Sequence, residues 1–548
     1  MRGDGRDWGP PGTRGRTDHA QAMKRYTRIG SLAAVLLLLV SLRLGPACLG
    51  AEANGSPAII EPDGKPGATV ELWLETSLKR IFPGSKPGST NLHLIAARNS
   101  KIALQACFRN NRVPPLNVEC NVLGAEELKP RVRFVGLVPM HHFTPHTELS
   151  ELDGAGHLPG LVPDPLWPLT KVQVGSYESR SFWITLKVPA DAKPGLREFT
   201  VRLSVNNGKR QVEFPVRLWV GDLVVQPRRG FPIIHWWRGE ATWDYYKTGM
   251  FDERWYKITR MQLENMIEHG SDVIYVPMFF DRRETFKRPC QLLVVNEPQP
   301  GKYEFLKKEG ILEDSYFHLS DEPGGGQHIT NYKRARQILR ELAPWMKVMD
   351  ALSDIQYGRQ GLTDIPIPLV SAAQAYIDER IPHWVYYCCA PQGPWLNRFM
   401  DTPLPKIRMS GMLFYRLGAQ GFLHWGFNYW HKMEREEIGD PFNDASNASW
   451  PGIPYGDPFV IYPGADGRPM DSIRWEVFAE SLQDYAILQT AGINRPIRCW
   501  RTSRPTRSFP RRKNGSKKRS RTFSRESLGR LNRPHSCIKG ARGMHHRP

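Results

Sequence analysis

Two adjacent carboxylates, Asp321 and Glu322, are the residues in this sequence best suited to acid–base chemistry. Ionising one carboxylate raises the cost of ionising its neighbour, so the pair should titrate at two different pH values and one member can stay protonated near neutrality. Such a pair supplies a proton donor beside a charged group that can orient a reacting atom. An isolated Asp-Glu-Pro is more often a solvated turn, so the flanking sequence has to decide between the two interpretations.

The flanking sequence places the pair at the end of a strand. Residues 315–319 are mostly aromatic or apolar, and no strand breaker occurs before Pro323. Pro323 and three glycines end the strand, and a helical pattern follows over residues 327–342. Parallel α/β barrels carry catalytic side chains at the carboxyl ends of their strands, so this order favours a catalytic pair.

Strands and helices alternate on both sides of this unit. Further strands are expected at 231–237, 272–278, 347–352, 368–373, 384–390 and 421–427, and helices at 252–269, in part of 397–417 and at 471–488. The strand count is seven, and the segment between 278 and 315 has room for a hairpin at 291–305 but not for another helix–strand unit. We therefore predict that residues 226–493 form a (β/α)8-type TIM barrel that lacks one β/α unit.

Residues 54–225 have a different pattern, with β-branched or alternating runs separated by Pro, Gly and Asn. The expected strands are 70–74, 102–108, 131–135, 182–188, 199–205 and 212–220. No long helical period interrupts them, so we predict an N-terminal β-sandwich in front of the barrel. The fold class is thus multidomain, all-β followed by α/β.

Residues 1–53 are expected to be an N-terminal extension and a signal peptide. A basic segment after Met23 precedes an apolar run at 29–42, and small residues around Ala51 and Ala53 offer cleavage sites. The apolar run is too short for a stable membrane span. We expect a secreted or periplasmic protein whose true start is Met1 or Met23; lipoprotein anchoring at Cys48 is less favoured, because Gly45 stands where such a signal wants Leu.

The net charge of +20 is concentrated at the C-terminus. Residues 494–548 contain 18 Lys and Arg residues and one acidic residue, so the remainder of the chain is nearly neutral. We expect this basic tail to be disordered, because it has too few apolar residues to form a core. It could be read as a nucleic-acid or anionic-surface binder, but the export signal argues against that, and we expect no nucleic-acid partner.

The motifs in the barrel resemble those of one enzyme family, glycoside hydrolase family 123. The resemblance covers roughly residues 55–492 and rests on His318-Leu-Ser-Asp-Glu-Pro323, on Gly421-Phe-Leu-His-Trp-Gly-Phe-Asn-Tyr-Trp430, and on Tyr462-Pro-Gly464 with Ser472-Ile-Arg-Trp-Glu476 and Asp484-Tyr485. The family has an N-terminal β-sandwich and a catalytic barrel. Its founding activity is the retaining hydrolysis of β-linked N-acetylgalactosamine.

The resemblance implies a role for each carboxylate and a carbohydrate substrate, either a glycan or a glycoconjugate. Glu322 would be the general acid and base, and Asp321 would orient the substrate's own 2-acetamido group, whose carbonyl oxygen attacks the anomeric carbon. Aromatic and polar residues near strand ends are the candidates for substrate binding: His235, Trp236, Tyr376, Tyr387, Trp425, Asn428 and Tyr462. We expect no metal and no cofactor.

Two departures from the family pattern leave alternatives open. The chain continues from Phe305 to Leu306 as though a segment were deleted there, and after Gly492 it turns into the basic tail. The protein could therefore be a carbohydrate-binding pseudoenzyme with an impaired barrel. It could also be an ordinary hydrolase in which Glu322 works with a distant carboxylate, namely Asp350, Asp354 or Asp457.

The signal-peptide interpretation predicts that residues 23 to about 53 are absent from exported protein, because a basic, then apolar, then small-residue order directs cleavage. N-terminal sequencing of protein recovered outside the cytoplasm measures this. A mature chain that begins at Met1 or Met23 would contradict the prediction.

Overall fold

The structure of the chain, a computed structural model, describes residues 52–54, 56–63, 68–249, 252–276, 291–294, 302–432, 437–445 and 453–493. The apolar run at 29–42 and the basic tail lie outside these residues. Within the described ranges, no helix is long and apolar enough to cross a membrane. The expected boundary after residue 53 falls inside a short strand, β1 (Glu52–Asn54), that pairs with a neighbouring strand.

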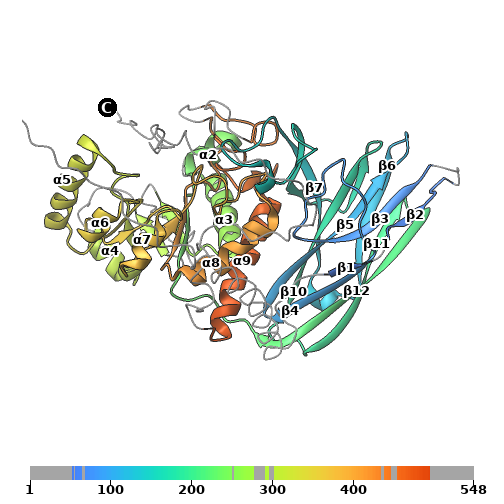
Figure 1. The fold of residues 1–548 in the computed structure, drawn as a ribbon, viewed down its shortest axis with the longest axis horizontal. Helices are drawn as coiled ribbons and strands as arrows, with labels where there is room; N and C mark the ends of the chain where they lie inside the picture. Colours follow the sequence, from blue (N-terminus) through green and yellow to red (C-terminus); the bar gives the residue numbers. More distant parts are fainter. Residues whose placement is uncertain are drawn as a thin grey trace, which may run out of the picture.

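The N-terminal half forms two six-stranded sheets. In order, the first contains β1, β4 (Asn91–Arg98), β12 (Arg210–Val224), β11 (Gly195–Val205), β6 (Leu116–Leu123) and β9 (Lys171–Val174). The second contains β2 (Ala58–Ile60), β3 (Val70–Thr76), β5 (Ser100–Asn110), β10 (Ser179–Val188), β7 (Arg131–Met140) and β8 (Gly160–Trp167). Figure 1 shows these strands grouped to one side of the molecule.

Alternation of side chains along the strands builds one core from both sheets. In β12, Phe214, Val216 and Leu218 are buried, whereas Arg217 and Trp219 between and beside them are exposed. The inward-facing residues of β12 belong to the same hydrophobic cluster as those of β3, β5 and β10 from the second sheet. The all-β character expected for residues 54–225 is therefore present in the structure.

The C-terminal half is organised around eight parallel strands. These are β13 (Ile233–His235), β14 (Val273–Val276), β15 (Gln291–Val294), β16 (Tyr316–Phe317), β17 (Lys347–Asp350), β18 (Ile365–Pro366), β19 (Val385–Tyr386) and β20 (Phe422–His424), in the order β18-β17-β16-β15-β14-β13-β20-β19. The two ends of this order meet, because the backbone N–H of Trp384 donates to Pro366 O at 3.1 Å and that of Tyr386 donates to Pro368 O at 3.1 Å. The strands thus close into a ring.

The expectation that one strand is missing was wrong. The hairpin expected at 291–305 is instead the parallel strand β15, which pairs with β14 and β16, followed by helix α4 (Lys302–Lys308). Four strand residues are too short a run to distinguish a hairpin arm from a ring strand, since that choice depends on distant pairing partners. The junction that we expected at Phe305–Leu306 lies within α4.

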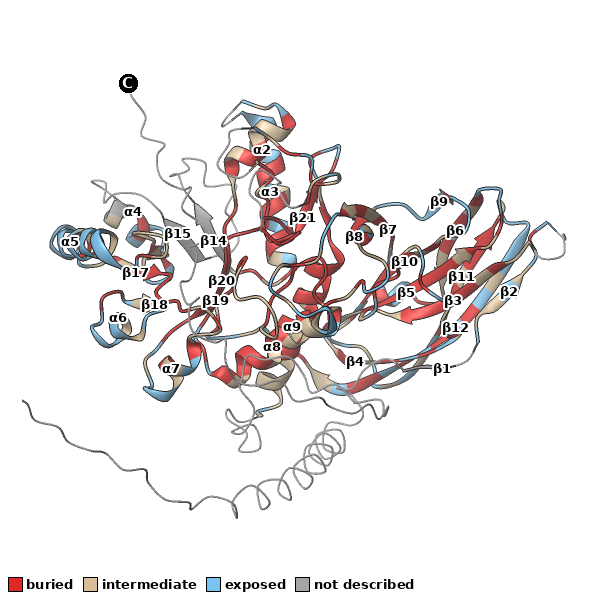
Figure 2. Ribbon diagram, turned by 45° about the horizontal axis from the view of Figure 1, so that its top comes forward, coloured by how far each residue is buried: buried red, intermediate tan, exposed pale blue. Residues whose placement is uncertain are grey.

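Helices surround the ring, and an antiparallel pair of strands, β21 (Ile461–Pro463) and β22 (Pro469–Asp471), follows β20. The remaining helices are α2 (Gly239–Tyr246), α3 (Glu253–Glu268), α5 (Gly326–Leu342), α6 (Ile355–Arg359), α7 (Ala373–Asp378), α8 (Leu404–Leu417) and α9 (Ile473–Thr490). Figure 1 shows α8 and α9 on the side of the ring facing the two sheets and α5 on the far side, and Figure 2 shows α9 mostly buried and α5 mostly exposed. α8 packs closely on α9 at Gly411, where a Cβ atom would lie 1.7 Å from Ser481 O.

A buried ion pair joins the two halves. Arg474 at the start of α9 donates from Nε to Asp164 Oδ1 at 2.9 Å and from Nη2 to Asp164 Oδ2 at 3.0 Å. Asp164 lies in β8 of the second sheet and also accepts a hydrogen bond from Tyr462 Oη at 2.7 Å. All three side chains are fully buried. The docking of α9 on the sheets therefore depends on charges that cannot be solvated if one partner is lost.

We predict that Asp164→Ala lowers the free energy of unfolding by about 3–5 kcal/mol, because it leaves the Arg474 guanidinium buried without its counter-charge. Denaturant unfolding of the full chain measures this. Glu213→Ala is the matched control, since Glu213 pairs with Arg202 on the exposed sheet face and should cost less than about 1 kcal/mol. Equal effects of the two variants would contradict the role of Asp164.

Candidate active site

The carboxylate pair lies in the loop directly after β16. Asp321 and Glu322 are both half-buried. The backbone of Glu322 has a φ of 41°, a left-handed conformation that residues other than glycine rarely adopt. Gly325 and Gly326 also have positive φ, with values of 45° and 50°, and α5 starts at Gly326. Backbone strain of this kind persists only where the surroundings hold it, and it is common at functional sites.

A buried carboxylate on the neighbouring strand holds this loop in place. Asp350, at the end of β17, accepts hydrogen bonds through Oδ1 from Leu319 N at 3.0 Å and Ser320 N at 3.2 Å. The same oxygen lies 2.8 Å from His318 Nδ1, and Oδ2 accepts from Tyr332 Oη at 2.6 Å. Asp350 is fully buried, and its four partners fix the backbone just before the pair.

Glu322 is held near its protonation midpoint at neutral pH. Burial, and then the negative charge of Asp321, raise the pKa of Glu322 to about 7. A hydrogen bond from Tyr386 Oη to Glu322 Oε1, 2.5 Å long, acts in the opposite direction and lowers this pKa. Tyr386 belongs to β19, so Glu322 is contacted from a different strand of the ring.

Asp321 has a different electrostatic environment. Burial raises the pKa of Asp321 above its ordinary value, and the charge of Asp350 adds to this, whereas the nearby charges of His318 and Arg238 limit the rise. His318 favours the charged state, because its hydrogen bond to Asp350 and the charge of Asp350 outweigh burial and raise the pKa of His318. Oδ2 of Asp321 is buried and has no hydrogen-bond partner among the described residues. A proton shared by the pair should therefore reside on Glu322, leaving Asp321 as the charged member with a free acceptor.

Alternation along the ring strands decides which predicted binding residues reach this site. Trp236 and Trp425 lie in one buried cluster with Tyr386 and with Ile234 and Leu423, the inward-facing residues of β13 and β20. Residues one position away on the same strands face outward, where the helices cover them. Trp236 and Trp425 therefore stay candidates for contacts with a ligand.

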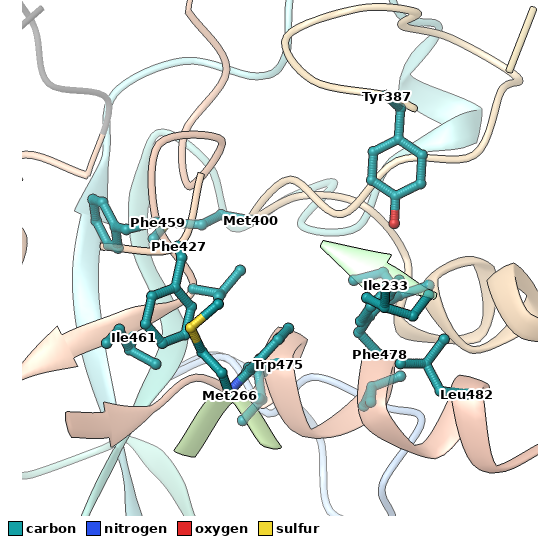
Figure 3. Close-up of a cluster of buried hydrophobic side chains, with 14 of the residues drawn as sticks. Ile233, Met266, Tyr387, Met400, Phe427, Phe459, Ile461, Trp475, Phe478 and Leu482 are labelled. Carbon is teal, nitrogen blue, oxygen red and sulfur yellow. The ribbon is translucent and has the colours of Figure 1, made fainter. Parts of the chain in front are cut away.

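Two predicted residues, His235 and Tyr387, have the outward orientation, and the structure corrects their assignment. His235 is fully buried, with Nδ1 2.6 Å from Ser271 Oγ and Nε2 2.7 Å from Arg398 Nη1. Tyr387 belongs to the hydrophobic core that includes residues of α8 and α9, and its ring points toward Ile233 in Figure 3. Neighbouring residues of a strand point to opposite faces. The sequence therefore identified the correct strand ends, but not which residue of each points into the ring.

Tyr376 and Tyr462 are also outside the site. Tyr376 lies in α7, and its hydroxyl donates to Leu352 O at 2.8 Å and to Asp354 O at 3.1 Å. Tyr462 bonds Asp164 between the two halves of the molecule. Both hydroxyls are used to satisfy buried polar groups, a requirement that no local sequence pattern reveals.

Asn428 acts on the site through Arg238, a residue that the sequence analysis missed. Asn428 is fully buried; its Oδ1 accepts from Arg238 N at 2.7 Å and its Nδ2 donates to Arg238 O at 2.9 Å. The Arg238 guanidinium lies 5.5 Å from the ring centre of Trp236 and 5.6 Å from that of Tyr429. Asn428 thus positions the Arg238 backbone. Arg238 lies three residues after β13 ends at His235, so the signal that could have found it is the same one, a polar side chain after a strand end.

The three distant carboxylates considered as alternative partners of Glu322 all have other contacts. The carboxylate oxygens of Asp350 are both occupied by the four hydrogen-bonding partners described above. Asp354 caps the N-terminus of α6 through a bond from Gln356 N at 2.9 Å and is exposed. Asp457 is fully buried and accepts from Trp425 Nε1 at 2.9 Å. Burial raises the pKa of Asp457 to about 7.

One group among the described residues has the spacing of metal ligands: His269, Asp471 and Glu476. Arg133 already supplies the positive charge there, with Nη1 2.6 Å from Asp471 Oδ2 and Nη2 2.6 Å from Glu476 Oε1. This set is better described as a second buried ion-pair cluster between β7 and α9 than as a metal centre.

Comparisons with known proteins give the following similarities. The model of the family "Glycoside hydrolase 123, catalytic domain" matches residues 236–306 and 303–491, in two segments that meet within α4. No curated protein sequence matches the chain. A solved structure of a family 123 glycoside hydrolase from Clostridium perfringens, described for glycolipid glycan hydrolysis, has a TM-score of 0.60 and 13% identity over 77% of this chain and 88% of its own.

Two other solved structures align more weakly. A β-glucuronidase from Parabacteroides merdae has a TM-score of 0.26 and 9% identity, covering 75% of this chain and 52% of its own. An endo-β-1,4-mannanase from Thermotoga petrophila has a TM-score of 0.26 and 12% identity, covering 48% of this chain and 77% of its own.

The contacts of Asp350 generate a pH-dependent prediction. The raised pKa of His318 contributes stability that is fully present below about pH 6.5, the ordinary His pKa, and is lost as the pH rises through the pKa of the folded state. Asp350→Asn removes that contribution, so it should destabilise the protein by about 1–3 kcal/mol near pH 6, and by less near pH 9. Denaturant unfolding at the two pH values measures the difference, which should vanish in a His318→Gln background. A pH-independent cost would contradict the proposed pairing.

Proposed function

The chain belongs to glycoside hydrolase family 123 through its catalytic domain at residues 236–491, and from this premise we propose that it hydrolyses β-linked 2-acetamido sugars of the N-acetylgalactosamine type with retention of configuration. As a member of this family it is a glycosidase and acts on a carbohydrate. The observation that carries the finer proposal is the pair at the end of β16, in which Glu322 has a pKa of about 7 and Asp321 presents an unpartnered acceptor.

Glu322 has the properties that a general acid and base needs. With a pKa of about 7, a large fraction of the side chain is protonated at neutral pH and can donate to the glycosidic oxygen as the leaving group departs. The resulting carboxylate can then remove a proton from water in the second half of the reaction. A carboxyl with an ordinary pKa would rarely carry the proton required for the first step.

The position of Asp321 favours attack by the substrate's own acetamido oxygen over attack by a protein nucleophile. Its free Oδ2 can accept the amide N–H of a 2-acetamido group, which would direct the acetamido oxygen to the anomeric carbon and stabilise the positive charge that develops on the ring formed. Asp350 and Asp354 are bonded to other groups, and burial raises the pKa of Asp457 to about 7, which favours its protonated form over the carboxylate that a nucleophile requires. Neighbouring carboxylates suit this chemistry, since both reach one face of one sugar.

The surroundings support the broader proposal. Trp236 and Trp425 face inward with Tyr386, and aromatic rings can stack on the apolar face of a pyranose. We interpret the closed ring as a (β/α)8-type barrel and the two sheets as a β-sandwich, in agreement with the fold shared with the Clostridium perfringens enzyme. That enzyme's action on glycolipid glycans supports a glycan or glycoconjugate as substrate, and the N-terminal signal supports an export route for this chain.

Two variants separate the roles of the pair. Glu322→Gln should lower hydrolysis of a glycoside with a poor leaving group by about 100-fold or more, yet spare much activity on an aryl glycoside whose leaving group departs without protonation. Asp321→Asn should impair both substrates, because formation of the cyclic intermediate suffers whatever group leaves. Steady-state kinetics of the full chain measures both.

The substrate itself provides the control. A β-linked 2-acetamido aryl glycoside should be hydrolysed and its 2-hydroxy counterpart should not, since a hydroxyl has no carbonyl oxygen to attack the anomeric carbon. Equal turnover of the two would favour a protein nucleophile. Binding of the sugar without turnover of either would favour the pseudoenzyme.

A further inference from the structure

Tyr386 makes a direct contact with Glu322 from across the ring. The residue is on the inward face of β19, is only 4% exposed, and donates from Oη to Glu322 Oε1 over 2.5 Å. Burial, and then the charge of Glu322, raise the pKa of Tyr386 well above its ordinary value. The phenol therefore keeps its proton at every pH at which Glu322 titrates, and it donates to Glu322 whenever that carboxyl group is ionised.

The other groups around Glu322 act against its ionised form or add no charge. Asp321, in the same loop, opposes a second negative charge. Cys388, two residues after the end of β19, is buried, and burial raises the pKa of its thiol, so it stays neutral. Among the groups described around Glu322, Tyr386 is thus the one that favours the carboxylate.

We propose that Tyr386 is a positioning residue that fixes the orientation of the Glu322 carboxyl group and stabilises its ionised state, so that the same group can both give and take a proton in one catalytic cycle. The catalytic role of this arrangement rests on the proposed glycosidase mechanism. The coupling between the Tyr386 hydroxyl and the Glu322 carboxyl group does not. Ser353 extends the arrangement: it accepts a hydrogen bond from Leu369 N at 3.0 Å, and its hydroxyl acts to lower the pKa of Tyr386, against the effect of burial.

The proposal has a stability signature that is independent of activity. Glu322 has a raised pKa in the folded protein, so its ionisation destabilises the fold as the pH rises from about 4.5 to about 7. Tyr386→Phe removes the donor and should raise that pKa by about one pH unit, so the variant loses more stability at pH 9 than at pH 5.5. The melting temperature relative to wild type should fall by about 1–3 °C more at pH 9 than at pH 5.5.

Two matched variants identify the source of any such difference. In a Glu322→Gln background, where no charge forms at residue 322, Tyr386→Phe should have the same effect at both pH values. Tyr387→Phe changes the neighbouring tyrosine, which directly follows β19 and lies in the hydrophobic core, and should give no pH-dependent difference. A difference that persists in the Glu322→Gln background, or equal losses at both pH values in the wild-type background, would overturn the proposal.

The pH profile of kcat/KM tests the catalytic consequence. The alkaline limb reports loss of the proton from Glu322 and should move up by about one pH unit in Tyr386→Phe, with Tyr387→Phe superimposing on wild type.

Where Tyr386→Phe reduces the yield of folded protein, Ser353→Ala serves instead and should move both readouts in the same direction by a smaller amount. A shift in the stability readout without any turnover would support the coupling and contradict the glycosidase mechanism; an unshifted alkaline limb in an active variant would overturn the catalytic part of the proposal.

Discussion

The buried charge of Asp350 is the constraint on which the carboxylate pair depends. A carboxylate removed from water must be fully hydrogen-bonded, and Asp350 meets this requirement by binding the loop that precedes the pair and Tyr332 of α5, which follows it. Because the backbone N–H groups of Leu319 and Ser320 are its donors, the loop cannot move without leaving that charge unsatisfied. The loop can then hold Glu322 in a left-handed conformation, which is unfavourable for that residue in isolation.

The pair gains its chemistry from unequal surroundings. Burial raises the pKa of both carboxyl groups; His318 and Arg238 limit the rise for Asp321 although Asp350 adds to it, whereas the negative charge of Asp321 raises the pKa of Glu322 further. The difference separates two groups that would titrate almost alike in water. The Tyr386 hydroxyl then limits how far the pKa of Glu322 can rise, so that its proton remains exchangeable near neutral pH.

The same electrostatic rule joins the two halves of the molecule. Asp164 with Arg474, and Arg133 with Asp471 and Glu476, are buried pairs that link the second sheet to the β22–α9 segment. Each charge has a partner on the other half, so separating the halves would expose or orphan both. These contacts explain why Tyr462, which follows the last ring strand in the sequence, serves the interface and not a ligand.

The sequence by itself determined the parts that depend on local physics. The aromatic strand, Pro323 and the glycines located Asp321 and Glu322 at the end of a strand before a helix, and alternation of apolar residues indicated an all-β half before an α/β half. Only the tertiary structure decided which face of a strand each residue occupies and which distant strands pair. His235 ends β13 and Trp236 follows it, yet their side chains point to opposite sides. β15 is recognisable only through its pairing with β14 and β16, and Tyr386 reaches Glu322 because β19 lies across the ring. Burial and long-range pairing set these choices, and neither is encoded in a short window of residues.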